Sequence, residues 1–563
     1  MNGEPSSRPP RVFFWCVAIV VGFIQVWAHR YNINPDSISY IEIAQSAREA
    51  GWKSYVNGYW SPFYPFLLTN VFRVFDPGPR WESTVAIFTN LAIYLANLAC
   101  FEWFLRELIL LRDASNQPAE RGFPISSRTL WICGYVFFLW AGQFWVTPSW
   151  VSPDLCVAGL GYLATAALIR IHRGQASWAT FVFFAAVLGL GYLAKAPMFP
   201  FAFVFLACGF LAVRSNRQAL PRATLAVLVF FMVAAPFAIS LSRTKGRMTF
   251  GDSGRINYAE FVNGAPKYVY WEGQPPGTGT PAHPLHKLLA EPPLYEFAAP
   301  IGGSYPLWYD PSYWYEGIKP HFSLKGQLMA VYRTTSSYLR IFSVTGTLYA
   351  VFIALFFLVR KSGSWGGRWR EEKFVWIPLL AAFAMFALVH VEPRFVGGFS
   401  LMLLMRLLAG VRFAKPAENG ALSGLASVII LAPALAIVFS TGKELRDIGR
   451  PVPFEQWEVA RGLNELGVPP GSNLGSIGTG LGAYWAHLAD MRIIAEIPGE
   501  DQRVFLAADP EKKRAIIGKF GEAGATAVIT HNIAVVHSME GWRQIRGTHY
   551  FLRETGTPAL KSE

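Results

Sequence analysis

Eleven apolar runs, each 17–23 residues long, dominate the first 440 residues of the chain. About 20 apolar residues cross the hydrocarbon core of a bilayer as a helix, and a helix satisfies its backbone hydrogen bonds internally. Only 15% of the residues are charged, whereas a soluble domain carries about 25%. The sequence therefore predicts a polytopic α-helical membrane protein, with spans at residues 12–28, 83–105, 129–146, 153–169, 178–194, 197–213, 223–241, 339–359, 374–390, 395–411 and 421–440.

Basic residues alternate between the two sides of these predicted spans. Short loops on one side are rich in Arg and Lys, whereas those on the other side carry almost none except Lys195 and Arg394. The positive-inside rule then places the N-terminus in the cytoplasm, and eleven spans place the C-terminus outside. We predict a multi-pass protein of the plasma (inner) membrane. A cleaved signal peptide is the alternative for the first run, but residues 27–30 (Trp-Ala-His-Arg) make a poor cleavage site.

The net charge of +13 follows the same pattern. Residues 441–563 carry −1 and the other residues carry +14. Because the excess lies in short loops between apolar runs, topology explains it, and no nucleic-acid partner is predicted. The five cysteines lie in or beside apolar runs and have neither metal-ligand nor disulfide-framework spacing.

Three outward segments are long. Residues 29–82 form a first outer loop with amphipathic stretches at 37–50 and 62–75, which are predicted to lie along the membrane surface. Residues 242–338 are rich in aromatic residues, Gly and Pro, most densely at 305–315, and are predicted to form an ordered cap. Residues 441–563 alternate helical and strand patterns, which predicts a small extracytoplasmic α/β domain after a transmembrane domain of residues 1–440.

Two outward carboxylates are the candidate catalytic groups. Asp36 follows the first span, and Asp154 precedes the fourth in the sequence Ser152-Pro153-Asp154. A carboxylate at this level can act as a general base toward an acceptor hydroxyl. For each residue the alternative is that it only caps the helix that follows.

The two exceptional cations, Lys195 and Arg394, are candidate ligands for a lipid phosphate. Arg in particular suits bidentate phosphate binding. Lys195 could instead extend to a lipid headgroup, and Glu392 could be a simple ion-pair partner of Arg394. Arg243 follows the seventh span with other basic residues and is a further candidate, although a solvated loop is equally compatible with that pattern.

Histidines give only weak metal signals. His390 has no second His at metal-ligand spacing and could be a buried polar residue. His283 and His286 are three residues apart but lack an evident third ligand. The prediction is that no metal is required, although a divalent metal is not excluded.

The order and side of these motifs resemble the GT-C class of membrane glycosyltransferases, which includes protein O-mannosyltransferases, aminoarabinose transferases and lipopolysaccharide-core glycosyltransferases. The resemblance covers about residues 10–440 and rests on the first outer loop, the turns at residues 152–154, 194–197 and 392–395, and an outer C-terminal domain. One departure is that many members have two adjacent acidic residues in the first loop, whereas Asp36 is followed by Ser37.

This resemblance implies a polyprenyl-phosphate-linked sugar as donor and a lipid, glycan or protein as acceptor on the outer membrane face. It implies that Asp36 is the base, with Asp154 assisting, and that Lys195 and Arg394 bind phosphate. The expected substrate contacts are Tyr40, Tyr59, Trp60, His390 and Glu392. The alternatives are a transporter or flippase of lipid-linked glycans and a non-catalytic membrane assembly partner; a transporter would need polar groups near the bilayer midplane.

Overall fold

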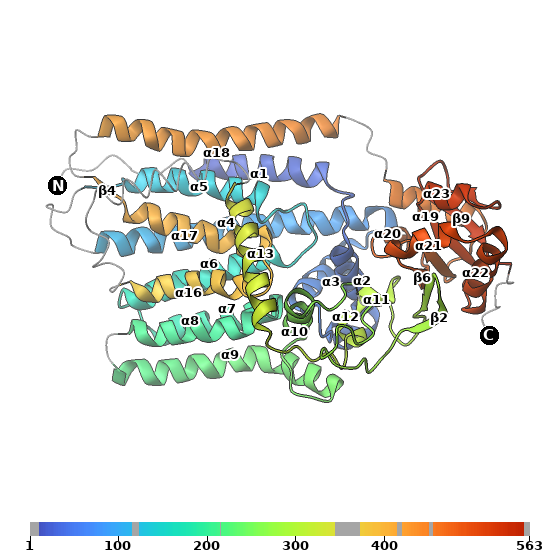
Figure 1. Cartoon of the computed structure of the whole chain (residues 1–563). Coiled ribbons are helices and arrows are strands. Elements are labelled where there is room, and N and C mark those ends of the chain that lie inside the picture. The colour runs from blue at the N-terminus through green and yellow to red at the C-terminus, as the bar shows by residue number, and fades with distance from the viewer. Residues whose placement is uncertain are drawn as a thin grey trace.

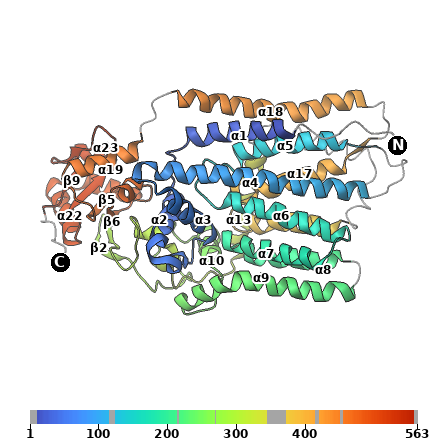
Figure 2. The ribbon, with the colours of Figure 1, turned by 180° about the vertical axis from the view of Figure 1, so that it is seen from behind.

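The computed structural model describes residues 11–114, 123–213, 216–268, 270–343, 372–413, 419–449 and 454–556. Its apolar helices run alongside one another in a bundle, and the first of them, α1, begins at one end of that bundle (Figures 1 and 2). These helices are α1 (Arg11–Ala28), α4 (Pro79–Ala114), α5 (Ser127–Phe144), α6 (Asp154–His172), α7 (Trp178–Ala194), α8 (Met198–Ala212), α9 (Asn216–Lys245), α16 (Lys373–Ala387), α17 (Pro393–Gly410) and α18 (Asn419–Ile448).

Within the described residues, five helices are long and apolar enough to cross a membrane: α1, α4, α6, most of α9, and α17. The helices α7, α8 and α16 are apolar but shorter. Each coincides with a predicted run, so the structure has the helical architecture of a multi-pass membrane protein. The predicted span at residues 339–359 lies mostly outside the described residues.

Helix α13 (Leu324–Ser343) differs from the prediction, which ended the cap loop at residue 338. Only one side of this helix is apolar, and polar residues such as Arg333 and Thr334 interrupt the run. Hydropathy alone therefore missed its first fifteen residues, 324–338. Helix α13 crosses the bundle obliquely instead of following the other helices (Figure 1).

The end of the bundle opposite the start of α1 carries an outer layer built from the first outer loop and the cap segment (Figure 1). The predicted amphipathic stretches are helices α2 and α3. The elements of this layer are α2 (Pro35–Ala50), η1 (Gly51–Tyr55), α3 (Phe63–Phe75), α10 (Ser253–Tyr258), η3 (Ala259–Asn263), α11 (Pro306–Tyr309) and α12 (Pro311–Trp314).

The C-terminal residues, together with a hairpin from the cap segment, build a seven-stranded sheet in the order β2-β3-β6-β5-β7-β9-β8. Strand β5 pairs in parallel with both β6 and β7, as expected where helices alternate with strands. The strands are β2 (His286–Ala290), β3 (Pro293–Glu296), β5 (Asn473–Ile477), β6 (Arg492–Ile497), β7 (Ala527–Thr530), β8 (Arg543–Gln544) and β9 (Phe551–Glu554), with helices α19 (Glu455–Glu465), α20 (Tyr484–Leu488), α21 (Gln502–Ala507), α22 (Pro510–Glu522) and α23 (Ile533–His537).

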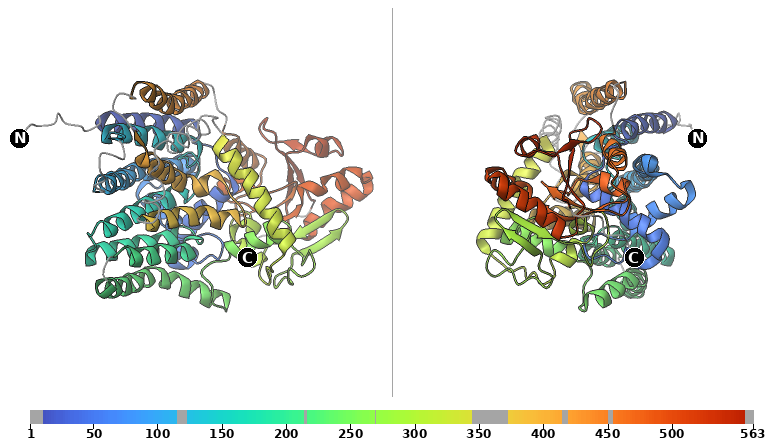
Figure 3. Two further views of the ribbon diagram at one scale, coloured as in Figure 1. Left: turned by 60° about the vertical axis from the view of Figure 1, so that its left-hand side comes forward. Right: turned by 90° about the vertical axis from the view of Figure 1, so that its right-hand side faces the viewer.

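The sheet is not made by the C-terminal residues alone, because the β2–β3 hairpin belongs to the cap segment and β3 pairs antiparallel with β6. Helix α18 also continues past the predicted boundary at residue 440. A second, two-stranded sheet joins β1 (Phe123–Pro124) to β4 (Arg412–Phe413). Figure 3 shows that the cap segment and the α/β domain lie together at one end of the bundle.

Hydrophobic packing connects the α/β domain to the membrane part. One continuous core cluster includes bundle residues together with Tyr484 and Trp485 of α20. At this junction Tyr31 stacks on Phe454, with ring centroids 4.3 Å apart. A second, smaller cluster surrounds Phe520 inside the α/β domain. The α/β domain is therefore packed against the outer layer, which fixes its position relative to α2.

Candidate active site

Arg394 is the centre of a cluster of charged side chains at the ends of four helices, α2, α6, α7 and α17. Its guanidinium faces three carboxylates: Nη2 lies 3.1 Å from Asp36 Oδ2, Nη1 lies 3.6 Å from Asp154 Oδ2, and Nε donates to Glu392 Oε2 at 2.7 Å. The Asp36 and Arg394 positions are 358 residues apart in sequence. The structure thus brings together the predicted base and a predicted phosphate ligand.

Lys195 completes this cluster through Asp154. Lys195 Nζ donates to Asp154 Oδ1 at 2.5 Å, and it lies 4.0 Å from the centre of the Phe395 ring. The Asp154 side chain is only 3% exposed, so its charge depends on the two cations for compensation. Asp154 is therefore the carboxylate partner that the structure gives Lys195, and extension to a lipid headgroup stays an untested alternative.

Local helix geometry explains why these side chains point toward one another. Helix α2 is capped by Asn34, whose side chain accepts from the Ser37 N–H, so the Asp36 carboxylate is not used for capping. Asp154 is the first residue of α6, and no side chain caps that helix. Helix α17 begins at Pro393, where a fixed φ suits the first turn. The capping alternative is therefore wrong for both acidic residues.

Aromatic side chains cover the Asp36 side of the cluster. Trp308 Nε1 donates to Asp36 Oδ1 at 3.3 Å, and Trp60 Nε1 donates to the Trp308 carbonyl at 3.1 Å. The Tyr59 ring lies 5.8 Å from Trp308, and the Tyr40 ring lies 5.1 Å from Trp60. Tyr40, Tyr59 and Trp60 were expected near substrate. Trp308 was not singled out, although it lies in the densest aromatic stretch of the cap.

Glu392 and His390 support Arg394 from the other side. His390 Nε2 lies 3.3 Å from Glu392 Oε1, and the His390 ring stacks on Phe261 with centroids 4.1 Å apart. Burial alone would raise the pKa of Glu392, but the His390 hydrogen bond and the Arg394 charge lower it to about 2. Glu392 therefore remains ionised and acts as a fixed partner of Arg394.

Glu260 is a further residue near the site, after Trp308, that the sequence analysis did not single out. Tyr315 Oη lies 2.7 Å from Glu260 Oε1 and 2.6 Å from the Pro266 carbonyl. Burial raises the pKa of Glu260 to about 7, against smaller opposing effects of Tyr315 and Lys267. Burial, together with the charges of Glu260 and Asp36, also raises the pKa of Tyr59. Tyr59 thus lies within the field of both carboxylates.

Arg243 is not joined to the Arg394 cluster by any ion pair or hydrogen bond among the described residues. It is exposed near the end of α9. The neighbouring basic side chains are compensated locally, because Arg247 pairs with Asp252 at 2.6 Å and Lys245 pairs with Glu316 at 3.4 Å. No ion pair or hydrogen bond among the described residues supports a role of Arg243 in phosphate binding, and that role stays a prediction.

Metal-ligating side chains do not gather in the part of the chain that the structure describes, where no group of three or more His, Cys, Asp or Glu residues is arranged to hold an ion. His283 stacks on Tyr313 with centroids 3.9 Å apart, while His286 lies 2.8 Å from Glu296. These two histidines therefore have separate partners.

The bundle and its outer layer have the fold of the GT-C membrane glycosyltransferases. Two solved structures share it over nearly the whole chain, each at 14% identity, covering 98% of this chain and 99% of theirs. They are ArnT from Cupriavidus metallidurans in the apo state, with a TM-score of 0.55, and the same protein bound to undecaprenyl phosphate, with a TM-score of 0.56. The sequence matches no protein-family model and no curated protein.

Proposed function

We propose that this protein is a glycosyltransferase that moves a sugar from a polyprenyl-phosphate donor to a lipid, glycan or protein acceptor on the outer face of the plasma (inner) membrane. The observation that carries the proposal is the bridge formed by Arg394 between Asp36 and Asp154, with Lys195 on Asp154. The ArnT structure with undecaprenyl phosphate supports this donor class, because a protein of the same fold binds such a lipid.

Charge balance suggests how the donor would enter. Three carboxylates surround Arg394 and Lys195, so the two cations are already compensated before a phosphate arrives. A donor phosphate would compete with Asp36 for Arg394 Nη2. Asp36 would then be released from its ion pair and would be free to accept a proton. Buried Asp154 would keep both cations in position.

The transfer is a single displacement at the anomeric carbon. The acceptor hydroxyl gives its proton to Asp36 as its oxygen bonds to that carbon, and the bond from carbon to the phosphate oxygen breaks. The electron pair leaves with the polyprenyl phosphate, whose added negative charge is stabilised by Arg394 and Lys195 more strongly than the ground state was. Inversion of configuration is what the GT-C resemblance implies. This scheme requires no nucleotide or metal, and it does not exclude a divalent ion.

The position of the charged groups favours this proposal over a transporter. Asp36, Asp154, Lys195 and Arg394 lie at or next to the first or last residues of their helices. A transporter of lipid-linked glycans would place its polar binding groups near the bilayer midplane. A non-catalytic assembly partner would not depend on the Asp36 carboxylate at all.

The test uses purified full-length protein in lipid nanodiscs, a panel of labelled polyprenyl-phosphate sugars and a membrane-lipid extract as acceptor. Wild-type protein should transfer or hydrolyse one donor, and Asp36→Asn should abolish that turnover while leaving the folded yield unchanged. A scaffold protein would still complement a gene deletion when it carries Asp36→Asn. If no donor in the panel turns over with wild-type protein, the enzyme proposal is wrong.

A further inference from the structure

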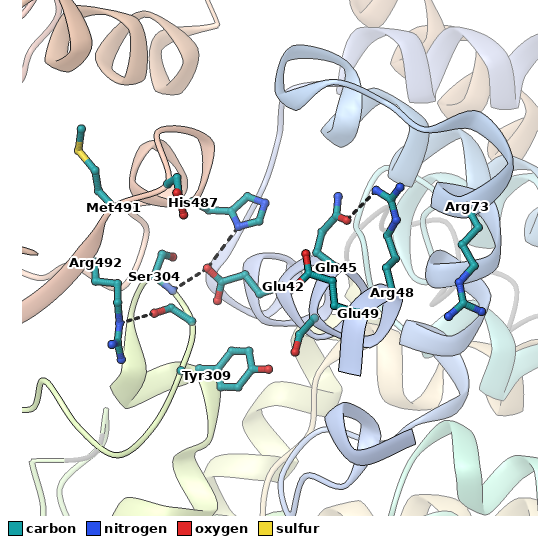
Figure 4. A pocket seen from close by; sticks show the side chains of 14 residues that line it. Glu42, Gln45, Arg48, Glu49, Arg73, Ser304, Tyr309, His487, Met491 and Arg492 are labelled. Carbon is teal, nitrogen blue, oxygen red and sulfur yellow. Dashed lines mark hydrogen bonds and ion pairs between the residues drawn. The ribbon is translucent and has the colours of Figure 1, made fainter. Parts of the chain in front are cut away.

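A second polar site lies beyond the aromatic layer that covers Asp36. It is a cavity of about 860 Å³ between α2, α3, residues 302–309 and the α20–β6 connection. Figure 4 shows Glu42 at its centre, pointing toward Ser304 and His487, with Arg48 and Arg73 on the α2–α3 side. None of the residues in the Arg394 cluster lines this cavity. It is therefore separate from the reacting groups.

We infer that this cavity binds the sugar portion of the acceptor. The inference rests on the proposed function and specifies its acceptor as a glycan-bearing molecule. The composition of the cavity wall argues against an apolar occupant, because most of the residues that line it are charged or polar.

An unsatisfied hydroxyl is the first observation that points to a ligand. Ser304 is only 5% exposed, and its Oγ has no hydrogen-bond partner among the described residues. Its backbone N–H, by contrast, donates to Glu42 Oε1 at 2.9 Å. A buried polar atom without a partner is destabilising, because it has lost its hydrogen bonds to water. A ligand hydroxyl inside the cavity would remove that destabilisation.

The charges of the cavity wall select the chemical class of that ligand. Arg492 donates to the carbonyls of Ile301 and Gly303, and Arg73 donates to the carbonyl of Ala47. Among the described residues, neither guanidinium has a carboxylate ion-pair partner, and the rim residues Glu49 and Asp490 likewise form no ion pair.

A wall with spare donors and spare acceptors suits hydroxyl groups, since each hydroxyl both donates and accepts. A simple anion would meet the exposed carboxylates Glu49 and Asp490, and a simple cation would meet the arginines. The ring of Tyr309 adds an aromatic surface at the same cavity. A polyhydroxylated ring with apolar faces matches all of these features.

Helix α2 connects the cavity to the reacting groups. Asp36 is in its first turn, while Glu42 and Glu49 line the cavity. At 1.5 Å of rise per residue, these positions are about 9 and 20 Å from Asp36 along the helix. Trp308 touches Asp36, and the next residue, Tyr309, lines the cavity. A glycan with its reacting hydroxyl at Asp36 would therefore extend into this space.

Gly302→Trp is the main test, because Gly302 lines the cavity and an added Cβ would meet no atom within 4 Å. Gly518→Trp is the matched control, since its Cβ position on α22 is equally open and does not line the cavity. The assay uses full-length protein in nanodiscs with the membrane-lipid extract that wild type labels. Gly302→Trp should raise the acceptor KM at least tenfold, while donor KM and donor hydrolysis by water remain within twofold of wild type.

Ser304→Ala provides a smaller perturbation, with an expected three- to tenfold rise in acceptor KM. Periodate oxidation of the extract, which cleaves sugar diols, should abolish acceptance. Mild acid releases the glycan from its lipid. Testing the released glycan as an acceptor distinguishes an acceptor that must be lipid-linked from a free glycan. An unchanged acceptor KM in Gly302→Trp, or a labelled acceptor without sugar, would refute the cavity assignment. Absence of any turnover by wild type would instead refute the proposed function.

Discussion

Helix α2 contributes to two clusters in which a cation lies between carboxylates, and their cations differ. In the first, Arg394 lies between Asp36 and Asp154. In the second, the His487 ring lies 3.5 Å from Glu42 Oε1 and 2.8 Å from Glu82 Oε2. Arg remains charged at any physiological pH, whereas His titrates near neutrality.

The elements that supply these clusters also differ. The Arg394 cluster joins the start of α2 to the ends of the bundle helices α6, α7 and α17, while the His487 cluster joins α2 and α4 to α20 of the α/β domain. Tyr484 of α20 also donates to Glu82, at 2.8 Å. A permanent charge suits a site that must exchange one anionic partner for another. A titratable charge between buried carboxylates suits a junction that holds two parts of the molecule together.

Arg394→Lys is expected to have the largest effect on catalysis. Lysine keeps the charge but cannot face three carboxylates with separate N–H groups. Loss of a preorganised donor to a developing oxyanion costs about 10²- to 10³-fold in kcat, and we expect a loss in that range. Initial rates of sugar transfer measure it, with the folded yield from size-exclusion chromatography as a control. A kcat within threefold of wild type would show that the Arg394 cluster does not depend on the guanidinium, and the contrast with the His487 cluster would be lost.

Sequence patterns singled out four members of the Arg394 cluster one by one, although they left open whether Asp36 and Asp154 share one site. Lys195 and Arg394 are cations on the side where the positive-inside rule expects few, and Asp36 and Asp154 are carboxylates beside apolar runs. The same hydropathy pattern predicted the positions of the apolar bundle helices, although α18 continues past the predicted end at residue 440. The resemblance of these motifs to the GT-C class then indicated the fold.

The remaining contacts depend on folding over long separations, which no local pattern encodes. Trp308 and Asp36 are 272 residues apart, and His487 and Glu82 are 405 residues apart. Glu82 and His487 also carry no local sign of function, because each lies in an ordinary helical sequence. Likewise, the pairing of β3 with β6 depends on where the cap folds, and the sequence of residues 286–296 does not specify that partner.

His487→Gln is expected to have the second-largest effect, and on stability instead of chemistry. Removing one partner from a buried ion pair costs about 3–5 kcal/mol, because Glu42 and Glu82, each less than 10% exposed, would keep unpaired charges. We expect a lower melting temperature in nanodiscs and a kcat for the remaining folded protein within about fivefold of wild type. A variant as stable as wild type would contradict the junction role.

The pH dependence of the melting temperature is a further test of the His487 junction. Burial alone would lower the pKa of His487, but the charges and hydrogen bonds of Glu82 and Glu42 raise it well above its ordinary value. The stabilisation is therefore fully present below about pH 6.5, the unfolded value, and is lost as pH rises through the folded pKa. The melting temperature of wild type should fall on the alkaline side, and this fall should be absent from His487→Gln.

Glu260→Gln is expected to have the smallest effect. It tests whether the pH dependence of donor binding comes from Glu260 and not from the Arg394 cluster. The pKa of Glu260, raised by burial to about 7, makes this group neutral below pH 7 and negative above it. The new negative charge beside Tyr59 disfavours an anionic donor, so wild-type donor KM should rise severalfold from pH 6 to pH 8. Glu260→Gln should flatten this rise, whereas the exposed control Glu511→Gln should retain it.

The same substitution has a stability consequence of defined sign. A carboxyl whose folded pKa is raised binds its proton more tightly in the folded state, so its contribution to stability declines as pH rises from about 4.5 toward 7. Glu260→Gln should therefore melt at a higher temperature than wild type above pH 7 and at a similar one below pH 5. If the donor KM of Glu260→Gln keeps the wild-type pH profile, the titrating group belongs to the Arg394 cluster itself. The contrast between a permanent and a titratable site would then be wrong.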